Sequence, residues 1–128
     1  MSRILIDTNA YSALMGGDGR IADILARHEA VLLSPVVIGE LYDGFLNGTR
    51  NAENREILNH FREKPRTVCV PISDSTAEWY AEIKRILRKK GRPIPINDVW
   101  IAASCMEHGA ALLTLDTHFA EIDGLLRV

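Results

Sequence analysis

The stretch Arg3-Ile4-Leu5-Ile6-Asp7-Thr8-Asn9 lies near the start of the chain and decides how the rest of it is interpreted. Its apolar residues follow one another without a polar break, which is typical of a short strand buried on both faces. Strands of this kind belong mainly to parallel sheets that are covered by helices. Asp7 follows the strand directly, at the carboxyl end where open α/β sheets bind their ligands.

Similar apolar runs recur along the chain, separated by amphipathic stretches. We expect further buried strands at 31–33, 67–70 and 111–115, and a last short strand at 125–128. Helices are predicted at 18–28, 34–48, 51–61, 75–90 and 97–108. Strands that alternate with helices predict a three-layer α/β/α sandwich with a central, mainly parallel sheet of four to five strands. We assign the whole chain, 1–128, to a single domain of this fold.

Local sequence signals mark where several of these helices begin and end. Ser34-Pro35 combines an N-cap residue with a proline at the first helical position. Ser75-Thr76-Ala77-Glu78 resembles a capping box at the head of the helix that follows it. A further helix is expected to begin around Asn97 and Asp98 and to end before Gly109.

The composition is that of an ordinary globular protein, with 128 residues of which 47% are hydrophobic and 25% are charged. No apolar run approaches the roughly 18 residues that a membrane span requires, and the first strand begins too early to leave room for a signal peptide. The two cysteines, Cys69 and Cys105, lie in separate apolar segments, so we expect buried thiols rather than a disulfide or a zinc site. We therefore predict a cytoplasmic protein with no membrane partner.

Four acidic residues occupy positions at which an α/β fold builds its sites: Asp7, Glu40, Asp98 and Asp116. Asp7 and Asp116 follow the first and fourth strands, so both belong at the carboxyl edge of the sheet. Glu40 and Asp98 lie in the early turns of two helices, and only the fold can bring Glu40 to the others. Each acid alone is more often a helix cap or a partner of a helix dipole, so the prediction rests on their joint pattern.

These acids, if gathered together, would need a cation. Two carboxylates about 4 Å apart repel by roughly 4 kcal/mol at an effective dielectric constant of about 20, and the sequence places no lysine or arginine beside any of the four. Hard oxygen ligands without cysteine or histidine suit Mg²⁺ or Mn²⁺. Such an ion accepts phosphate oxygens and lowers the pKa of a bound water, which predicts hydrolysis of a phosphodiester; one ion and two ions both remain open.

The net charge of −2, from 17 acids and 15 bases, is unusual for a protein that binds a polyanion. Four of those acids belong to the proposed site, and without them the chain carries a small positive excess. A metal bound by the four acids would offset their negative charge and so weaken this argument against nucleic-acid binding, although the chain has no long basic stretch. Its most basic segment contains the candidate nucleic-acid contacts Arg88, Lys89, Lys90 and Arg92, for which a helix C-terminus and a solvated face are the alternatives.

Four short motifs follow one another along the chain. They are Leu5-Ile6-Asp7-Thr8-Asn9, Ile38-Gly39-Glu40-Leu41, Asn97-Asp98-Val99-Trp100-Ile101-Ala102-Ala103 and Thr114-Leu115-Asp116-Thr117-His118-Phe119. Taken in this order, they resemble the motifs of PIN domains. Among PIN domains, the chain is most similar to the VapC-type toxins of bacterial toxin–antitoxin pairs, and the resemblance covers essentially all of it. One such motif has little specificity, whereas four in order within a short chain are specific.

The resemblance implies that the four acids form the Mg²⁺ or Mn²⁺ site of an endoribonuclease. Thr8 and Thr114 would then offer hydroxyls to the metal ligands or their waters, and Asn9 would brace the pocket from behind. It further implies an RNA substrate and a cognate antitoxin that holds the toxin inactive by lying across its groove. A homodimer is also implied, for which the amphipathic segments 18–28 and 51–61 are the candidate surfaces.

Several other residues are open to two interpretations. His118 stands two residues after Asp116 and could approach a bound phosphate. Since imidazole is a poor ligand for magnesium, we expect its ring to face solvent or to cap a turn. The aromatic residues Trp79, Tyr80 and Trp100 could stack on bases, but their helical settings favour roles in the core or in a subunit contact.

Other functional classes fit the sequence less well. A phosphatase of the haloacid-dehalogenase type needs a second acid two positions after the first, where this chain has Asn9. A receiver-like signalling module needs paired acids after the first strand, where Thr8 follows Asp7. It also needs a lysine at a later strand end, where Asp116 follows Leu115. DNA cleavage remains open because the metal chemistry does not itself distinguish the sugars. A PIN domain that only binds nucleic acid would normally have lost metal ligands, whereas this chain retains all four acids.

Overall fold

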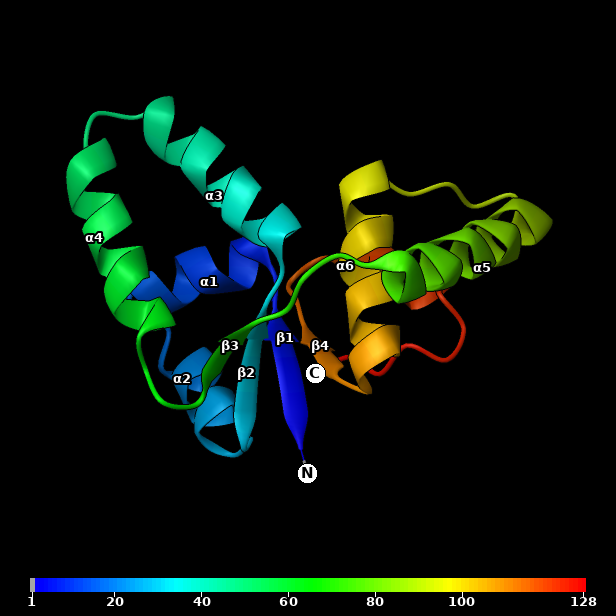
Figure 1. Cartoon of the computed structure of the whole chain (residues 1–128), viewed down its shortest axis with the longest axis horizontal. Coiled ribbons are helices and arrows are strands. Elements are labelled where there is room, and N and C mark those ends of the chain that lie inside the picture. Colours follow the sequence, from blue (N-terminus) through cyan, green and yellow to red (C-terminus); the bar gives the residue numbers. More distant parts are fainter. Residues whose placement is uncertain (1) are drawn as a thin grey trace.

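The computed structural model describes residues 2–128 and arranges them as a parallel sheet with helices on both sides (Figure 1). The strands are β1 (Arg3–Ile6), β2 (Ala30–Leu33), β3 (Thr67–Cys69) and β4 (Ala111–Leu113), in the spatial order β3-β2-β1-β4. Every neighbouring pair is parallel. The predicted α/β/α sandwich is therefore confirmed, with four strands in its sheet.

Within residues 2–128, six α-helices and one 3₁₀ helix connect and cover these strands. They are α1 (Thr8–Met15), α2 (Gly19–Ala26), α3 (Pro35–Leu46), α4 (Asn51–Arg62), α5 (Asp74–Lys90), α6 (Ile96–His108) and the 3₁₀ helix η1 (Thr117–Glu121). The chain moves along the sheet in one direction from β1 to β3 and returns to the other side of β1 with β4. Right-handed crossovers then put α1–α4 on one face and α5–α6 on the other, and Figure 1 shows these two groups on opposite sides of the strands. No helix between residues 2 and 128 is long and apolar enough to cross a membrane.

The helix ends follow mainly from local capping. The Ser34 hydroxyl accepts a hydrogen bond from the Val36 backbone N–H at 3.1 Å, and Pro35 takes the first helical position of α3. Gly91 and Gly109 end α5 and α6 with φ of 63° and 60°, a left-handed conformation that costs glycine little. The predicted end of the last long helix before Gly109 is confirmed.

Several local predictions are wrong. The cap of α5 is Ser73 rather than Ser75, because the Ser73 N–H donates to the Thr76 hydroxyl at 3.0 Å and α5 begins at Asp74. The segment 125–128 is not a strand, since it pairs with the sheet only through the single bridge between Leu112 and Arg127. β4 stops at Leu113, two residues before the predicted end of that strand.

Two further differences do not arise from capping. Helix α1 was not predicted, because its residues have only a weak apolar periodicity and the turn from β1 into it is immediate. Cys69, expected to be buried, is exposed because β3 is an edge strand, whereas Cys105 is buried as expected.

The packing of α6 connects the core to the carboxyl edge of the sheet. Ala102, Ala103 and Cys105 of this helix are fully buried, and such small side chains allow close packing against the sheet. Because a crossover helix runs antiparallel to its strands, its first turn lies at the carboxyl edge. At the same edge, the Asp7 N–H donates to the Leu113 carbonyl at 3.2 Å, which joins the ends of β1 and β4.

Candidate functional site

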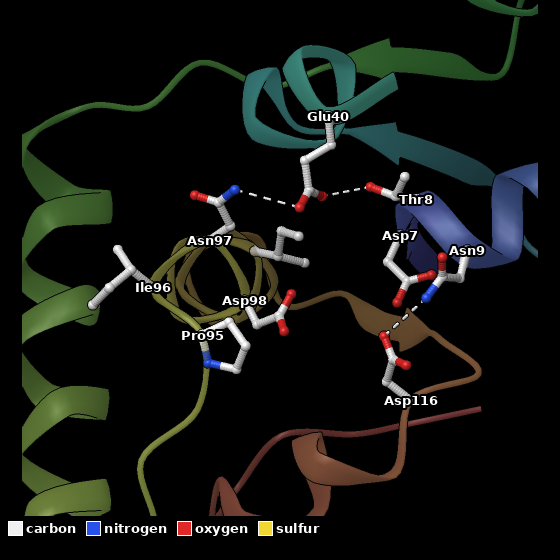
Figure 2. Close-up of a pocket in the computed structure, with 10 residues that line it drawn as sticks. Asp7, Thr8, Asn9, Glu40, Pro95, Ile96, Asn97, Asp98 and Asp116 are labelled. Carbon is white, nitrogen blue, oxygen red and sulfur yellow. Dashed lines mark hydrogen bonds between the residues drawn. The ribbon is translucent and has the colours of Figure 1, made fainter. Parts of the chain in front are cut away.

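A cavity of about 420 Å³ opens at the carboxyl edge of the sheet (Figure 2). Its lining residues are Asp7, Thr8, Asn9, Glu40, Pro95, Ile96, Asn97, Asp98, Ile101 and Asp116. All four acids singled out from the sequence therefore lie around one space. They come from the end of β1, from α3, from the first turn of α6 and from the loop after β4.

Asp7 is the most deeply buried of the four acids, with 3% of its surface exposed. It is the N-cap of α1, where its Oδ1 accepts the Ala10 N–H at 3.0 Å. Its Oδ2 accepts a hydrogen bond from the Thr114 hydroxyl. Burial raises the pKa of Asp7, and the charges of Asp116 and Asp98 raise it further, while the two hydrogen bonds act in the opposite direction.

Glu40 is brought to the cavity by the packing of α3 and is held by two neutral donors. The Thr8 hydroxyl donates to its Oε1 at 2.5 Å, and the Asn97 side-chain amide donates to its Oε2 at 3.3 Å. Figure 2 shows the carboxylate between these two partners. Three segments that are distant in the sequence thus meet on one side chain.

Asp98 lies in the first turn of α6 and is hydrogen-bonded to a histidine. The His118 Nε2 is 2.7 Å from its Oδ2. Burial raises the pKa of Asp98, the contact with His118 lowers it, and the charges of Glu40 and Asp116 raise it. The expectation that the His118 ring faces solvent holds only in part, because 36% of the side chain is exposed but Nε2 contacts Asp98 of α6.

Asp116 occupies the N-cap position of η1. The Asn9 side-chain amide donates to its Oδ2 at 3.2 Å, and its own N–H donates to the Thr114 hydroxyl at 3.0 Å. Thr114 therefore contacts two of the acids, because it donates to Asp7 and accepts from Asp116. The three residues that the sequence assigned to supporting roles all bond to acids of the cavity: Thr8, Asn9 and Thr114.

The charge of the cavity is not balanced by basic side chains. Within residues 2–128, none of the four acids forms an ion pair with a lysine or an arginine, and His118 is the one basic partner. Burial raises the pKa of Asp7 and of Asp98, and the charges of the neighbouring acids raise both further. A divalent cation would relieve this repulsion.

The donor set fits a hard cation that keeps part of its water. Between residues 2 and 128, no three acidic, histidine or cysteine side chains converge closely enough to ligate one ion by themselves. Mg²⁺ usually retains several waters and takes only one or two carboxylates directly. The oxygen donors around the cavity therefore match an ion that is held partly through water.

Two residues that bond to the acids were missed as site residues by sequence reasoning: Asn97 and His118. Asn97 stands directly before Asp98 in the sequence, and its bond to Glu40 crosses to another helix. His118 was noticed but assigned elsewhere. Their partners lie 57 and 20 residues away, so only the fold reveals these contacts.

The candidate nucleic-acid contacts do not line the cavity. Arg88, Lys89 and Lys90 lie at the end of α5, and Arg92 follows its glycine cap. Lys90 is engaged elsewhere, since its Nζ lies 2.7 Å from Asp123 Oδ1. Arg88, Lys89 and Arg92 form no ion pair with any of the four acids.

The aromatic residues Trp79 and Tyr80 lie on α5 and Trp100 lies on α6, the two helices that cover one face of the sheet (Figure 1). Tyr80 and Trp100 stack with their ring centroids 4.1 Å apart, which joins α5 to α6. Trp79 is 37% exposed. The predicted packing role therefore holds for Tyr80 and Trp100.

Comparisons with known proteins agree with this geometry. The family model for the PIN domain matches residues 4–125. Ribonuclease VapC5 of Mycobacterium tuberculosis is 27% identical over 97% of this chain and 90% of the relative.

Solved structures have the same fold. The structure of VapBC2 from Rickettsia felis, bound to a DNA fragment from their promoter, superimposes with a TM-score of 0.84 and 25% identity over 98% of this chain and 97% of that chain. VapBC-5 from M. tuberculosis, a member of the VapBC family of toxin–antitoxin systems, has a TM-score of 0.75 and 24% identity over the full length of both chains.

Proposed function

The chain belongs to the PIN domain family, and we propose that it is a metal-dependent endoribonuclease, the toxin of a toxin–antitoxin pair. The observation that carries this proposal is the cavity at the carboxyl edge of the sheet. Four carboxylates from four separate segments line it without a lysine or arginine partner among residues 2–128. Such an arrangement destabilises a protein unless it binds a cation.

Mg²⁺ or Mn²⁺ bound there would activate a water and neutralise charge on the phosphodiester. Asp98 and Asp116 are suited to hold it, because each has one oxygen, Oδ1, that takes no hydrogen bond from the described residues. Asp7 and Glu40 have both oxygens engaged, and each carboxylate oxygen still has a further lone pair. The charge of Asp7 and Glu40 would attract the ion into the cavity, and their free lone pairs would accept hydrogen bonds from its waters.

The chain's own residues also orient the site. Thr114 keeps Asp7 and the Asp116 backbone together, while Thr8 and Asn97 keep the Glu40 carboxylate from turning away. Hydroxyl and amide donors do this without adding positive charge, which would compete with the metal. The four acids are thus directed at one space.

RNA is the substrate that the relatives support, since the VapC5 relative is named a ribonuclease. The remaining runner-up is DNA, which the same metal chemistry would also cleave. Arg88, Lys89 and Arg92 are proposed as outer contacts for the nucleic-acid backbone, and they would make binding depend on salt.

A cognate antitoxin is the proposed protein partner, because the fold matches chains of VapBC toxin–antitoxin systems. We also propose a homodimer in the cytoplasm, with α2 and α4 as the contacting helices. Light scattering of the purified chain, alone and with the product of the neighbouring gene, measures both assemblies. A strict monomer would contradict the homodimer.

Cleavage of total cellular RNA by the partner-free protein tests the activity. Wild type is compared in Mg²⁺, in Mn²⁺ and in chelator, and next to Asp7→Asn and the control Asp43→Asn. Asp43 lies on the same helix as Glu40 but is exposed and outside the cavity. We expect metal-dependent cleavage that Asp7→Asn loses and Asp43→Asn keeps. Cleavage that persists in chelator or in Asp7→Asn would contradict the mechanism, and cleavage of DNA alone would identify the runner-up substrate.

A further inference from the structure

His118 lies at the rim of the acidic cavity without belonging to the four acids. It is the second residue of η1, and its side chain is 36% exposed. The neighbouring Phe119 is fully buried and anchors this turn in the core. The centroids of the two rings lie 4.9 Å apart and the ring planes are inclined by 34°, so the imidazole packs against the buried Phe119 ring.

The bond from His118 to Asp98 does not depend on the charge of the ring. An ionised carboxylate only accepts hydrogen bonds, so Nε2 must be the donor over its 2.7 Å distance to Oδ2. The neutral tautomer with its proton on Nε2 and the doubly protonated ring both meet this condition. With the Asp98 carboxylate ionised, Nε2 is therefore the donor whichever charge the ring carries.

This bond leaves one Asp98 oxygen available. Oδ2 is held by His118, while Oδ1 receives no hydrogen bond from residues 2–128. The last torsion of an aspartate is broad, so an untethered carboxylate samples many orientations. Figure 2 shows the Asp98 carboxylate directed toward Asp7 and Asp116, on the cavity side of α6.

We propose that His118 is a positioning residue for the metal site: its Nε2–H fixes the Asp98 carboxylate so that the second oxygen faces the ion. The inference rests on the proposed function, because it gives one further residue of this chain a role toward the same cation. Outer partners of this kind orient a ligand, and their loss costs about 10–100-fold in metal affinity. The expected effect of His118 is therefore on metal binding, with no contact to RNA.

A merely structural tie between η1 and α6 is the competing explanation, and the chain contains a matched histidine that separates the two. His108 lies at the other end of α6, and its Nε2 is 3.5 Å from the Glu107 carboxylate. Its side chain is 27% exposed, comparable to that of His118, and it does not line the cavity. Each alanine substitution therefore removes a histidine that neighbours an acid of α6: Asp98 in the case of His118 and Glu107 in the case of His108.

The test measures binding of Mn²⁺ alone, from the paramagnetic resonance signal of the free ion, in the absence of RNA. The variants are His118→Ala, His118→Gln, His108→Ala and Asp98→Asn, and their melting temperatures are recorded in chelator. We expect His118→Ala to bind Mn²⁺ about 10–100-fold more weakly than wild type. His118→Gln, which retains an N–H donor on a side chain of similar reach, should restore most of the affinity, and His108→Ala should leave it unchanged.

RNA cleavage adds a second readout. If His118 acts through the metal, a high Mn²⁺ concentration should return the kcat of His118→Ala toward that of wild type. A histidine that contacts RNA directly would instead leave a defect in kcat or KM at saturating metal, which would overturn the proposal.

The outcomes separate failure of this inference from failure of the proposed function. Normal Mn²⁺ affinity in His118→Ala, with lost affinity in Asp98→Asn, overturns the role of His118 alone. Equal loss in His118→Ala and His118→Gln overturns the hydrogen-bond role. Mn²⁺ affinity unchanged in Asp98→Asn as well would overturn the metal site itself. A change in melting temperature of His118→Ala without a change in Mn²⁺ affinity would identify the purely structural tie.

Discussion

The two ends of α6 carry acids in similar surroundings that have different roles. Asp98 lies in the first turn and Glu107 in the last, and the side chain of each is 15% exposed. Each also lies beside a histidine, His118 for the first and His108 for the second. Burial and a neighbouring imidazole therefore do not distinguish a structural acid from a candidate metal ligand.

The other partners of the two acids make the difference. Glu107 accepts hydrogen bonds from the Thr76 hydroxyl and, at 3.2 Å, from the Ser73 hydroxyl, which ties the end of α6 to the start of α5. Asp98 has no hydroxyl partner in the described chain, and its other close neighbours are Glu40 and Asp116, which raise its pKa. An acid surrounded by donors stabilises the fold, whereas an acid that faces other acids is suited to bind a cation.

The largest expected effect is on catalysis. Asp98→Asn should reduce metal-dependent RNA cleavage by about 100-fold or more, because losing a metal ligand costs at least as much as losing an outer partner. Glu107→Gln should leave the specific activity of the folded protein unchanged. Initial rates at saturating RNA and Mg²⁺ measure both. Equal losses in the two variants would remove the distinction between the two ends of α6.

Metal binding should also stabilise the folded protein. An ion at a hundred times its dissociation constant adds about 2.7 kcal/mol when it binds only the folded state. We expect Mn²⁺ to raise the melting temperature of wild type and of Glu107→Gln by the same amount, and to have little effect on Asp98→Asn. Differential scanning fluorimetry with and without chelator measures the shift. A shift of full size in Asp98→Asn would place the ion elsewhere.

Two threonines sharpen the comparison, because they make the same bonds in the two regions. Thr114 donates to Asp7 and accepts the Asp116 N–H, while the fully buried Thr76 donates to Glu107 and accepts the Ser73 N–H.

Thr76→Val should lower the free energy of unfolding by about 1–3 kcal/mol, because it removes one of the two hydroxyl donors to Glu107 and leaves the Ser73 N–H without its acceptor. Thr114→Val should weaken Mn²⁺ binding by about tenfold. Urea denaturation and Mn²⁺ titration of both variants make the test. Weakened Mn²⁺ binding in Thr76→Val would show that the two regions are coupled.

The smallest expected effect is a dependence of stability on pH in the absence of metal. Burial raises the pKa of Asp7 above 3.8 in the folded state. The folded protein therefore holds this proton more tightly than the unfolded chain, and the associated stability is present below pH 3.8 and is lost as the pH rises through the folded pKa.

Asp7→Asn keeps an N-capping side chain but removes the charge. In chelator at neutral pH it should be more stable than wild type by about 1 kcal/mol, or a few degrees in Tm. The gap should narrow as the pH approaches 4. Urea denaturation across this range measures it, and a gap that is constant with pH, or widest at acidic pH, would contradict the assignment.

The sequence by itself determined three buried strands, most helix boundaries and the acids at the strand ends. These features depend on interactions within a few residues, such as the apolar run 4–6, the Ser34-Pro35 helix start and the glycine after α6. Even there, the N-cap of α5 is Ser73, two residues before the predicted Ser75, and the edge position of β3 exposed Cys69.

Only the tertiary structure decided which side chains meet the acids. Glu40 reaches the cavity because α3 packs beside α1 and α6, so that Thr8 and Asn97 bond to it across 32 and 57 residues of sequence. His118 reaches Asp98 across 20 residues because the buried ring of Phe119 fixes the turn that carries it. Apolar periodicity and capping are local, whereas these contacts depend on how helices from both faces of the sheet pack at its carboxyl edge.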